Sequence, residues 1–418
     1  MKTKTNYRRF LLLWSGELVS AIGGGLTSFG LGVYVFQTTG SAGSMALVTL
    51  LAFLPGMLLG VPAGVLADRY DRRLLMILGD GLSALGLVYI LLAMQNGGAS
   101  LQQICAGVVV SSVFSALLEP SYKATVTDLL SREEYSKASG LMSVAGSARY
   151  LISPLIAGAL LAVSDIRLLL LIDIGTFFLT AVCTAVVRAG LESRKRQDRP
   201  GFCSSFREGW AAITEKRGVL ILLVLSSLIT CFMGVLQVLS EPRLLAFVSS
   251  SVLGVAETIC ACGMLVSSLL LGMRGLKRNF ACVLSISLLL AGIAMMGFGW
   301  KENLYLICCF GFVFFFTLPF ANNALDFLIR TNIDPARQGR AWGLIGFLSQ
   351  MGYVVAYASA GLLADRVAAL RQITVGQGAA DVIKMAGFLL AAVAVLLNGF
   401  KDVRALEENE KTTHSESL

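Results

Sequence analysis

Long apolar runs, broken by short polar stretches, dominate the pattern of side chains along this chain. Most runs are about 20 residues long, which an α-helix needs to cross a bilayer, whereas membrane β-strands show about 10 residues of alternating character. The pattern therefore predicts an all-α membrane protein. The twelve expected spans are residues 10–36, 43–66, 74–94, 101–121, 141–163, 167–187, 218–239, 251–273, 279–299, 304–328, 340–363 and 381–400.

One long polar stretch, residues 188–217, separates six of the expected spans from the other six. Within it, Phe206, Trp210 and Ile213 recur at helical spacing, which predicts a short amphipathic helix at the membrane interface. We therefore expect four parts, which are an N-terminal six-helix bundle (1–187), a cytoplasmic linker (188–217), a C-terminal six-helix bundle (218–400) and a disordered cytoplasmic tail (401–418).

Composition and charge placement agree with a membrane location. Of the 418 residues, 56% are hydrophobic and 14% are charged, whereas about 25% of a soluble domain is charged. The net charge of +8 would also suit a nucleic-acid partner, but 27 of the 34 Lys and Arg residues lie in the tails and loops that share one side with both termini. The positive-inside rule places that side in the cytoplasm. We therefore expect a multi-pass protein of the bacterial cytoplasmic membrane, in contact with the lipid bilayer and with no nucleic acid.

The chain lacks the residue patterns of metal sites and enzymes. Its nine cysteines include no C-x-x-C pair, and its only histidine, His414, lies in the polar tail. Zinc and haem sites are therefore not indicated. There is neither a P-loop sequence nor an H-E-x-x-H motif, so direct use of ATP and zinc-dependent catalysis are not indicated either. We expect no catalytic residues, no enzyme activity, no metal and no cofactor.

The loop between the second and third spans has a distinctive sequence. Residues 64–73 read Gly-Val-Leu-Ala-Asp-Arg-Tyr-Asp-Arg-Arg between two apolar segments. This resembles the signature loop of the major facilitator superfamily (MFS), G-x-L-A-D-R-x-G-R-R/K, with Asp71 in place of the second glycine; an ordinary positive-inside loop is the alternative. The resemblance implies the MFS fold, in which two six-helix bundles enclose a site near mid-membrane. The matching residues of the expected conformational-switch loop are Gly64, Leu66, Ala67, Asp68, Arg69, Arg72 and Arg73.

One glycine and two aspartates in this region have expected structural roles. Gly64 would let helix backbones approach closely where the second span ends. Asp68 would cap the third span and accept hydrogen bonds from arginine. Asp80, near the inner end of the third span, would be a structural partner of the loop arginines.

Ionisable residues inside the spans are candidate transport residues, because charge in hydrocarbon is costly. Glu17 and Arg149 lie in the first and fifth spans, on the order of 10 Å from the cytoplasmic side at 1.5 Å per residue. We expect them to pair, or Glu17 to carry a proton while Arg149 tunes it; a permanent ion pair that only joins helices is the alternative. Asp173 in the sixth span fits either a proton relay or helix packing.

Candidate substrate contacts lie in later spans. Glu257 in the eighth span has no evident partner and is a candidate contact for a cationic substrate; a neutral carboxyl, or one facing an outer vestibule, is the alternative. Phe316 in the tenth span and Tyr353 in the eleventh are candidate walls of an apolar cavity. Their alternative role is packing or contact with lipid.

The fifth span contains the sequence Ser153-Pro154-Leu-Ile-Ala157-Gly158. It resembles the G-P-x-x-G-G motif of MFS antiporters, with Ser and Ala replacing two glycines. Pro154 frees a backbone carbonyl, and the small residues allow helices to approach closely, as an interface that moves requires. An ordinary proline kink with small-residue packing is the alternative.

Further segments resemble the macrolide-efflux-like, drug:proton antiporter branch of the MFS: Trp14-Ser-Gly-Glu17-Leu-Val-Ser20, Thr39-Gly-Ser-Ala42, Phe53-Leu-Pro55, Ile152-Ser-Pro154 and Gly339-Arg340. In that branch the position of Glu17 is often Gln. The resemblance implies export of amphipathic small molecules, driven by the proton gradient. We expect the transporter to be a monomer. The alternative is a carrier, in either direction, for a defined solute such as a siderophore, peptide or lysolipid.

Overall fold

The structure is a computed structural model that describes residues 2–95, 97–189, 210–211, 213–215, 217–276, 279–333 and 338–397. Twelve of its helical segments are long and apolar enough to cross a membrane, which confirms the expected number of spans and the all-α class. Most of the predicted linker 188–217, with its amphipathic helix, and the whole tail 401–418 lie outside the described residues.

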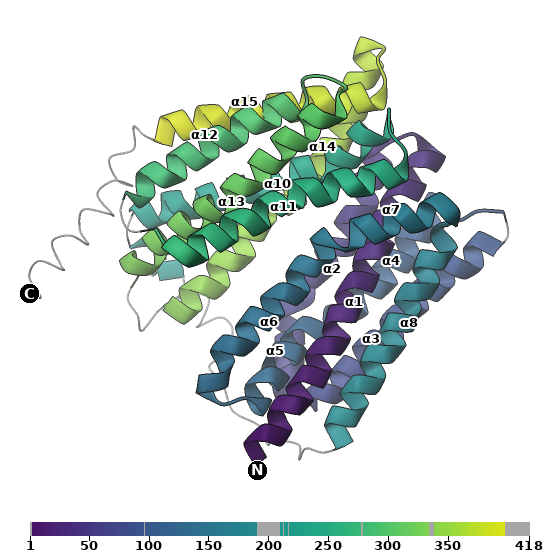
Figure 1. The fold of residues 1–418 in the computed structure, drawn as a ribbon, viewed down its shortest axis with the longest axis vertical. Coiled ribbons are helices and arrows are strands. Elements are labelled where there is room, and N and C mark those ends of the chain that lie inside the picture. The colour runs from purple at the N-terminus through teal and green to yellow at the C-terminus, as the bar shows by residue number, and fades with distance from the viewer. Residues whose placement is uncertain are drawn as a thin grey trace, which may run out of the picture. The chain divides into compact units, whose positions relative to one another are not determined.

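The chain forms two compact units, and the first comprises Met1–Asp198 with Val248–Thr258. Two of its spans are each built from two helices: α4 with α5, and α6 with α7. Its complete helices are α1 (Lys2–Thr39), α2 (Ala42–Arg69), α3 (Arg72–Gln95), α4 (Leu101–Ser115), α5 (Leu118–Leu129), α6 (Arg132–Leu151), α7 (Ser153–Val163) and α8 (Ile166–Ala189) (Figure 1).

Close helix contacts hold the first unit together. Helix α1 packs along α8, and α3 packs against both α4 and α8 (Figure 1). Gly86 of α3 faces the backbone of Gly107 in α4, so that even a methyl group would not fit between them. In a bilayer the hydrophobic effect does not draw helices together, so contacts of this kind stabilise the bundle through van der Waals packing.

The second unit comprises Arg199–Phe247 and Ile259–Leu418, so the division between the units runs through α11. Helix α10 packs on α14, and α12 packs on α13 and α15. Hydroxyl groups join α10 to α14: the Oγ atoms of Ser226 and Ser349 are 2.7 Å apart. The helices are α10 (Arg217–Leu245), α11 (Ser250–Arg274), α12 (Phe280–Phe298), α13 (Leu304–Asn332), α14 (Gln338–Arg371) and α15 (Val375–Leu397).

The eleventh span ends later, and the twelfth begins earlier, than the sequence predicts. The eleventh continues to Arg371 and the twelfth begins at Val375, because a helix can extend past the apolar core with its charged residues in water. Gln372 ends α14 by adopting the left-handed conformation, with φ of 54°.

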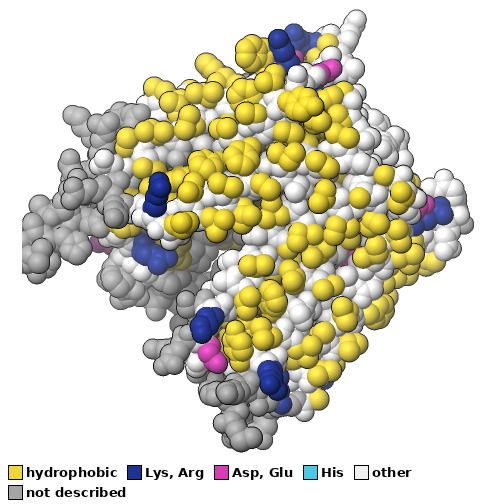
Figure 2. Space-filling model, viewed as in Figure 1, with side chains coloured by type: hydrophobic (Ala, Val, Ile, Leu, Met, Phe, Trp, Pro, Cys, Tyr) yellow, Lys and Arg dark blue, Asp and Glu magenta, His cyan; other side chains and the backbone are white. Residues whose placement is uncertain are grey.

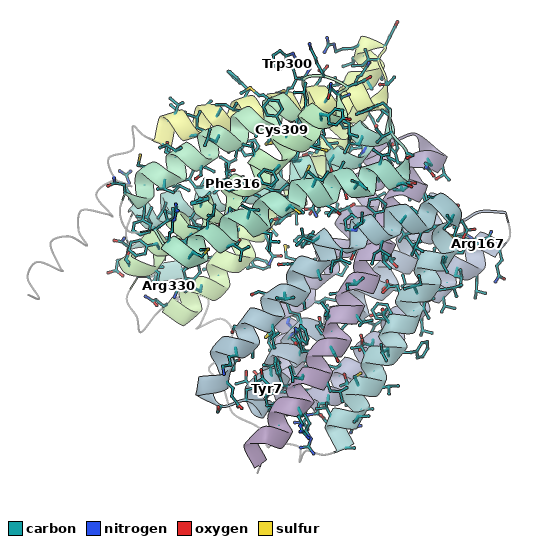
Figure 3. All side chains as sticks on the ribbon, in the orientation of Figure 1. Tyr7, Arg167, Trp300, Cys309, Phe316 and Arg330 are labelled. Atoms are coloured by element: carbon teal, nitrogen blue, oxygen red, sulfur yellow. The ribbon has the colours of Figure 1, made fainter. Side chains whose placement is uncertain are left out.

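Apolar side chains cover the outer flanks of the helices, as contact with lipid requires. Figure 2 shows hydrophobic side chains over most of the visible flanks, while the visible Lys, Arg, Asp and Glu side chains gather near helix ends. Within the first unit, Tyr7 and Arg167 lie at opposite ends (Figure 3). The Tyr7 end is therefore the one that the distribution of charge predicts to be cytoplasmic.

Candidate functional site

Arg72 connects the loop between α2 and α3 to helix α5. Its Nη1 donates to Asp128 Oδ2 at 2.8 Å and to the carbonyl of Ala124 at 3.1 Å, both near the end of α5. Its Nε donates to the carbonyl of Ala67 at 3.1 Å. Carbonyls at the C-terminal ends of helices attract cations, so one guanidinium joins the ends of α2 and α5. Asp68 forms a longer ion pair with Arg72, at 3.6 Å.

Asp71, the residue that departs from the MFS loop pattern, is the cap of α3. Its Oδ1 accepts a hydrogen bond from the backbone N–H of Arg73 at 3.0 Å, and its Oδ2 accepts one from Arg188 Nε at 2.8 Å. Burial alone raises the pKa of Asp71, but the bonds from Arg188 and the Arg73 backbone outweigh it and hold the pKa below its ordinary value. The expectation that Asp68 caps this helix is wrong, because Asp71 occupies the position from which a side chain reaches the free N–H groups.

The remaining loop residues differ in their surroundings. Arg69 is exposed, whereas Arg73 is buried and has an interaction partner. Among the described residues, no atom lies within 4 Å of where a Cβ at Gly64 would be. The expected close backbone approach at Gly64 is therefore absent within that part of the chain, and the role of the loop as a switch stays a prediction.

Asp80 is not a partner of the loop arginines. Its side chain is 1% exposed, and neither carboxyl oxygen has a hydrogen-bond partner among the described residues. It interacts instead with the like-charged Glu17 and Asp173. The expected pairing is wrong, because Arg72 bonds to Ala67 and Asp128 instead, and no described arginine forms a hydrogen bond with Asp80.

The three proton-coupling candidates, Glu17, Arg149 and Asp173, are brought together in the first unit by α1, α6 and α8. Arg149 interacts electrostatically with both Glu17 and Asp173, although none of the described ion pairs joins Arg149 directly to either acid. Asp173 is 2% exposed, and its Oδ1 accepts a hydrogen bond from Thr176 at 3.2 Å. The side chain of Arg149 is exposed.

The glycines of α1 allow this grouping. A Cβ at Gly23 would lie 2.7 Å from Asp173 Oδ1, and one at Gly25 would collide with Ser153 and approach the carbonyl of Arg149. Helix α1 therefore touches the segments of the fifth and sixth spans that hold these charged residues. The chemistry that the group can perform is proton binding, because its acids are protonatable and Arg149 stabilises their charged forms.

Pro154 lies at the break that divides the fifth span into α6 and α7, which fits both the antiporter-like motif and an ordinary proline kink. Ser153 is fully buried and its Oγ donates to the carbonyl of Ile22 in α1 at 3.0 Å. The carbonyl of Leu151, next to the break, accepts a hydrogen bond from Thr258 at 3.0 Å. A Cβ at Gly158 would meet the backbone of residues 250–254, and Ser251 Oγ donates to the Gly158 carbonyl at 3.0 Å. The motif thus permits close contact, while its link to antiport stays a prediction.

The three substrate-contact candidates do not share one unit. Glu257 belongs to the first unit and has an interaction partner, so the expectation that it lacks one is wrong. Tyr353 and Phe316 belong to the second unit. Tyr353 Oη lies 3.0 Å from Met233 Sδ. The ring of Phe316, labelled in Figure 3, is stacked with that of Phe312 and tilted by 41° against that of Phe320, both on α13. Their contact with a substrate stays a prediction.

The sequence did not indicate a cavity of about 490 Å³ at the Arg167 end of the first unit (Figure 3). Its polar walls include Tyr34, Gln37, Asp165 and Arg167. Arg167 donates from Nη2 to the carbonyl of Met94 at 2.6 Å, which closes one side. Because the cavity forms where residues of α1, α3, α8 and the intervening turns meet, no local pattern of residues could have revealed it.

Comparison with known proteins adds the following. The model of the family described as "Major Facilitator Superfamily" matches residues 13–357. Macrolide efflux protein A of Streptococcus pyogenes is 24% identical over 416 residues, which span 97% of this chain and 100% of that protein. Macrolide efflux protein A of Enterococcus faecalis is 25% identical over 310 residues, spanning 73% of this chain and 96% of that protein.

Among solved structures, a bacterial homologue of the iron transporter ferroportin in an inward-facing state matches with a TM-score of 0.72 at 16% identity, covering 94% of this chain and 98% of that one. The nucleoside transporter NupG matches with a TM-score of 0.72 at 14% identity, covering 94% of this chain and 100% of that one. At such low identity these likenesses show the fold alone.

Proposed function

Because the chain belongs to the Major Facilitator Superfamily, we propose that it exports amphipathic, macrolide-like small molecules in exchange for protons by alternating access. The substrate class and the outward direction are supported by its similarity to two macrolide efflux proteins. The proposal includes a monomer in the bacterial cytoplasmic membrane, with both termini in the cytoplasm and the proton gradient, rather than a cofactor, as the energy source. Macrolide resistance of the host would follow from such export.

The observation that supports proton coupling is the grouping of Glu17, Asp173 and Arg149 inside the membrane-spanning helices of the first unit. An ionised acid near Arg149 is stabilised by it, whereas a protonated acid is not. Binding or release of a proton therefore changes the electrostatic attraction between the acids on α1 and α8 and Arg149 on α6. A conformational equilibrium shifts by the difference in free energy that a ligand makes between its two states, and here the proton is that ligand.

The α2–α3 loop is a structural element that would respond to such a shift of the conformational equilibrium. Arg72 joins this loop to α5 through Asp128, and Asp71 joins it to α8 through Arg188. Both are charge-assisted hydrogen bonds, which are stronger than neutral ones. We propose that these bonds hold the ends of α2, α5 and α8 in one conformation and break when the helices move, so that the loop acts as the conformational switch.

The test is macrolide accumulation in a pump-deleted bacterial host that expresses the full chain. We expect low accumulation with wild type, high accumulation after an uncoupler collapses the proton gradient, and high accumulation for Glu17→Gln in both conditions. Glu134→Gln is the matched control, since Glu134 caps α6 by accepting from Ser131 N–H at 3.0 Å and Gln serves in the same capping box.

Export that persists after the uncoupler, or full activity of Glu17→Gln, would contradict proton antiport through Glu17. If expression of the wild-type protein leaves macrolide accumulation in the host unchanged, this substrate class is excluded. The carrier for a defined solute, such as a siderophore, peptide or lysolipid, would then be the function to test.

A further inference from the structure

The described residues include a buried acid that the mechanism above does not use. Asp80 lies eight residues into α3, about 12 Å along the helix at 1.5 Å per residue. Its side chain is 1% exposed, and neither carboxyl oxygen has a hydrogen-bond partner among the described residues. Buried polar groups are nearly always hydrogen-bonded, and an isolated carboxylate in a medium of low dielectric constant is far more costly than a neutral acid. The surroundings therefore suit the protonated form of Asp80.

The groups that face Asp80 strengthen this argument. Glu17 on α1 and Asp173 on α8 both interact with it, and both have its own sign of charge. Helix α4 contributes no charged residue, and Cys105 is its only titratable one. On α3 itself, Arg73 lies two turns away on the same face and has an interaction partner.

Other charged groups act on the neighbours of Asp80. From α5, Glu119 and Tyr122 interact with Glu17, and from α6, Arg149 interacts with Glu17 and Asp173. Glu17, Asp80 and Asp173 therefore act on one another, and Arg149 acts on two of them. A like charge nearby disfavours the ionised form of an acid, so these acids oppose one another's ionisation.

The side chains of this region fit a proton as ligand better than a metal ion. Within the part of the chain that the structure describes, no group of three or more His, Cys, Asp or Glu residues is placed to hold a metal ion. Asp173 differs from Asp80, because its carboxyl group is hydrogen-bonded to Thr176 at 3.2 Å. The carboxylate of Asp80, unlike that of Asp173, would therefore have no hydrogen bond to stabilise its negative charge.

We propose that Asp80 is a proton-binding residue, protonated at neutral pH in this conformation and titrating together with Glu17 and Asp173. On release, the O–H bond of the carboxylic acid breaks, the proton passes to water and the electron pair stays on the carboxylate. This deepens the proposed function by adding a third acid to the proton site. Its test needs no substrate, so it can fail or succeed independently of macrolide export.

The experiment is infrared difference spectroscopy on the purified full-length chain in lipid nanodiscs, without substrate. We expect wild type at neutral pH to show the carbonyl stretch of a protonated carboxylic acid, and Asp80→Asn to lose that component. Asp326→Asn is the matched control: Asp326 also lies in a span, but its side chain is exposed, so the component should remain.

Two results would overturn the proposal. One is a spectrum in which Asp80→Asn retains the whole band. The other is an Asp80→Asn protein that fails to fold, because Asn has nearly the shape of the neutral acid and only a structural need for the charged form would make it intolerable.

A second measurement tests the coupling among the acids. In Glu17→Gln a like charge beside Asp80 is removed, so ionisation of Asp80 becomes easier. The pH midpoint at which the Asp80 band disappears should therefore fall, by about one pH unit for a neighbouring charge in a poorly solvated site. A midpoint that is the same in both proteins would show that Asp80 titrates alone and would refute the shared site.

Discussion

The two units use polar groups in different ways. In the first, three acids and an arginine lie inside the spans and interact with one another. In the second, described ion pairs such as Arg243 with Glu302 lie near helix ends, while neutral groups join the helices in the spans, for example Tyr357 Oη, which donates to Gln237 at 2.8 Å. Neutral hydrogen bonds tolerate burial without titrating. The comparison teaches that the residues proposed to bind protons all belong to the first unit.

The largest expected effect follows from neutralising acids in each unit. Asp173→Asn should reduce uphill macrolide export to the level of the host without the gene, because the variant can no longer exchange a proton at that position. Asp326→Asn in the second unit should leave export unchanged. Export assayed in inside-out vesicles with an imposed pH gradient measures both. Equal losses of export in the two variants would contradict the proposed difference between the units.

The next largest effect concerns how the first unit holds its charged helices together. In Gly25→Ala, the new methyl group collides with the buried Ser153 and should destabilise the protein by about 1–3 kcal/mol. The methyl group of the neighbouring Gly24→Ala meets no atom of the described residues within 4 Å. This variant should be neutral or stabilising by up to about 1 kcal/mol, since Ala favours helix. Thermal unfolding of the purified variants measures this. If both variants behave alike, α1 does not pack as described.

An ion pair of the second unit should affect stability without affecting coupling. Arg243 is 2% exposed, and its Nη1 donates to Glu302 Oε1 at 3.0 Å. Glu302→Gln leaves the buried charge of Arg243 without its counter-ion. Because Glu302 is 41% exposed and water screens its charge, we expect a loss of about 1–2 kcal/mol, below the usual figure for a buried pair.

Thermal unfolding of Glu302→Gln, combined with the vesicle assay, tests this prediction. A lower unfolding temperature with an unchanged dependence of export on the pH gradient is expected. A changed dependence would show that the second unit also takes part in proton coupling.

The smallest expected effect is at Asp71. Its pKa is lowered in the folded protein, so its contribution to stability is present above the ordinary Asp pKa of about 3.9 and is lost as pH falls below it. Asp71→Asn keeps the cap, because Asn and Asp cap helices equally well, but weakens the bond to Arg188. We expect a loss of about 0.5 kcal/mol at neutral pH.

The unfolding temperatures of wild type and Asp71→Asn should converge as the pH is lowered toward about 3. A difference that stays constant with pH would mean that Asp71 stabilises the loop through its shape rather than its charge.

The amino-acid sequence by itself determined the twelve spans, the family resemblance and the positions of the membrane-embedded charges. These follow from local properties, because the length and polarity of an apolar run decide whether a helix can cross a bilayer. The expected grouping of Glu17 with Arg149 also came from the sequence, through their similar depth in two spans.

Only the tertiary structure decided which of these residues meet. Asp68 and Asp71 are both acids of one loop, yet Asp71 caps α3. Gly24 and Gly25 are adjacent, yet a Cβ at Gly25 would collide with Ser153, whereas one at Gly24 would meet no described atom within 4 Å. The partners of Asp80 depended on which face of α3 turned toward α1 and α8. Each outcome depends on the rotation of one helix against another, which is set by the packing of side chains from distant parts of the chain and leaves no local pattern to read.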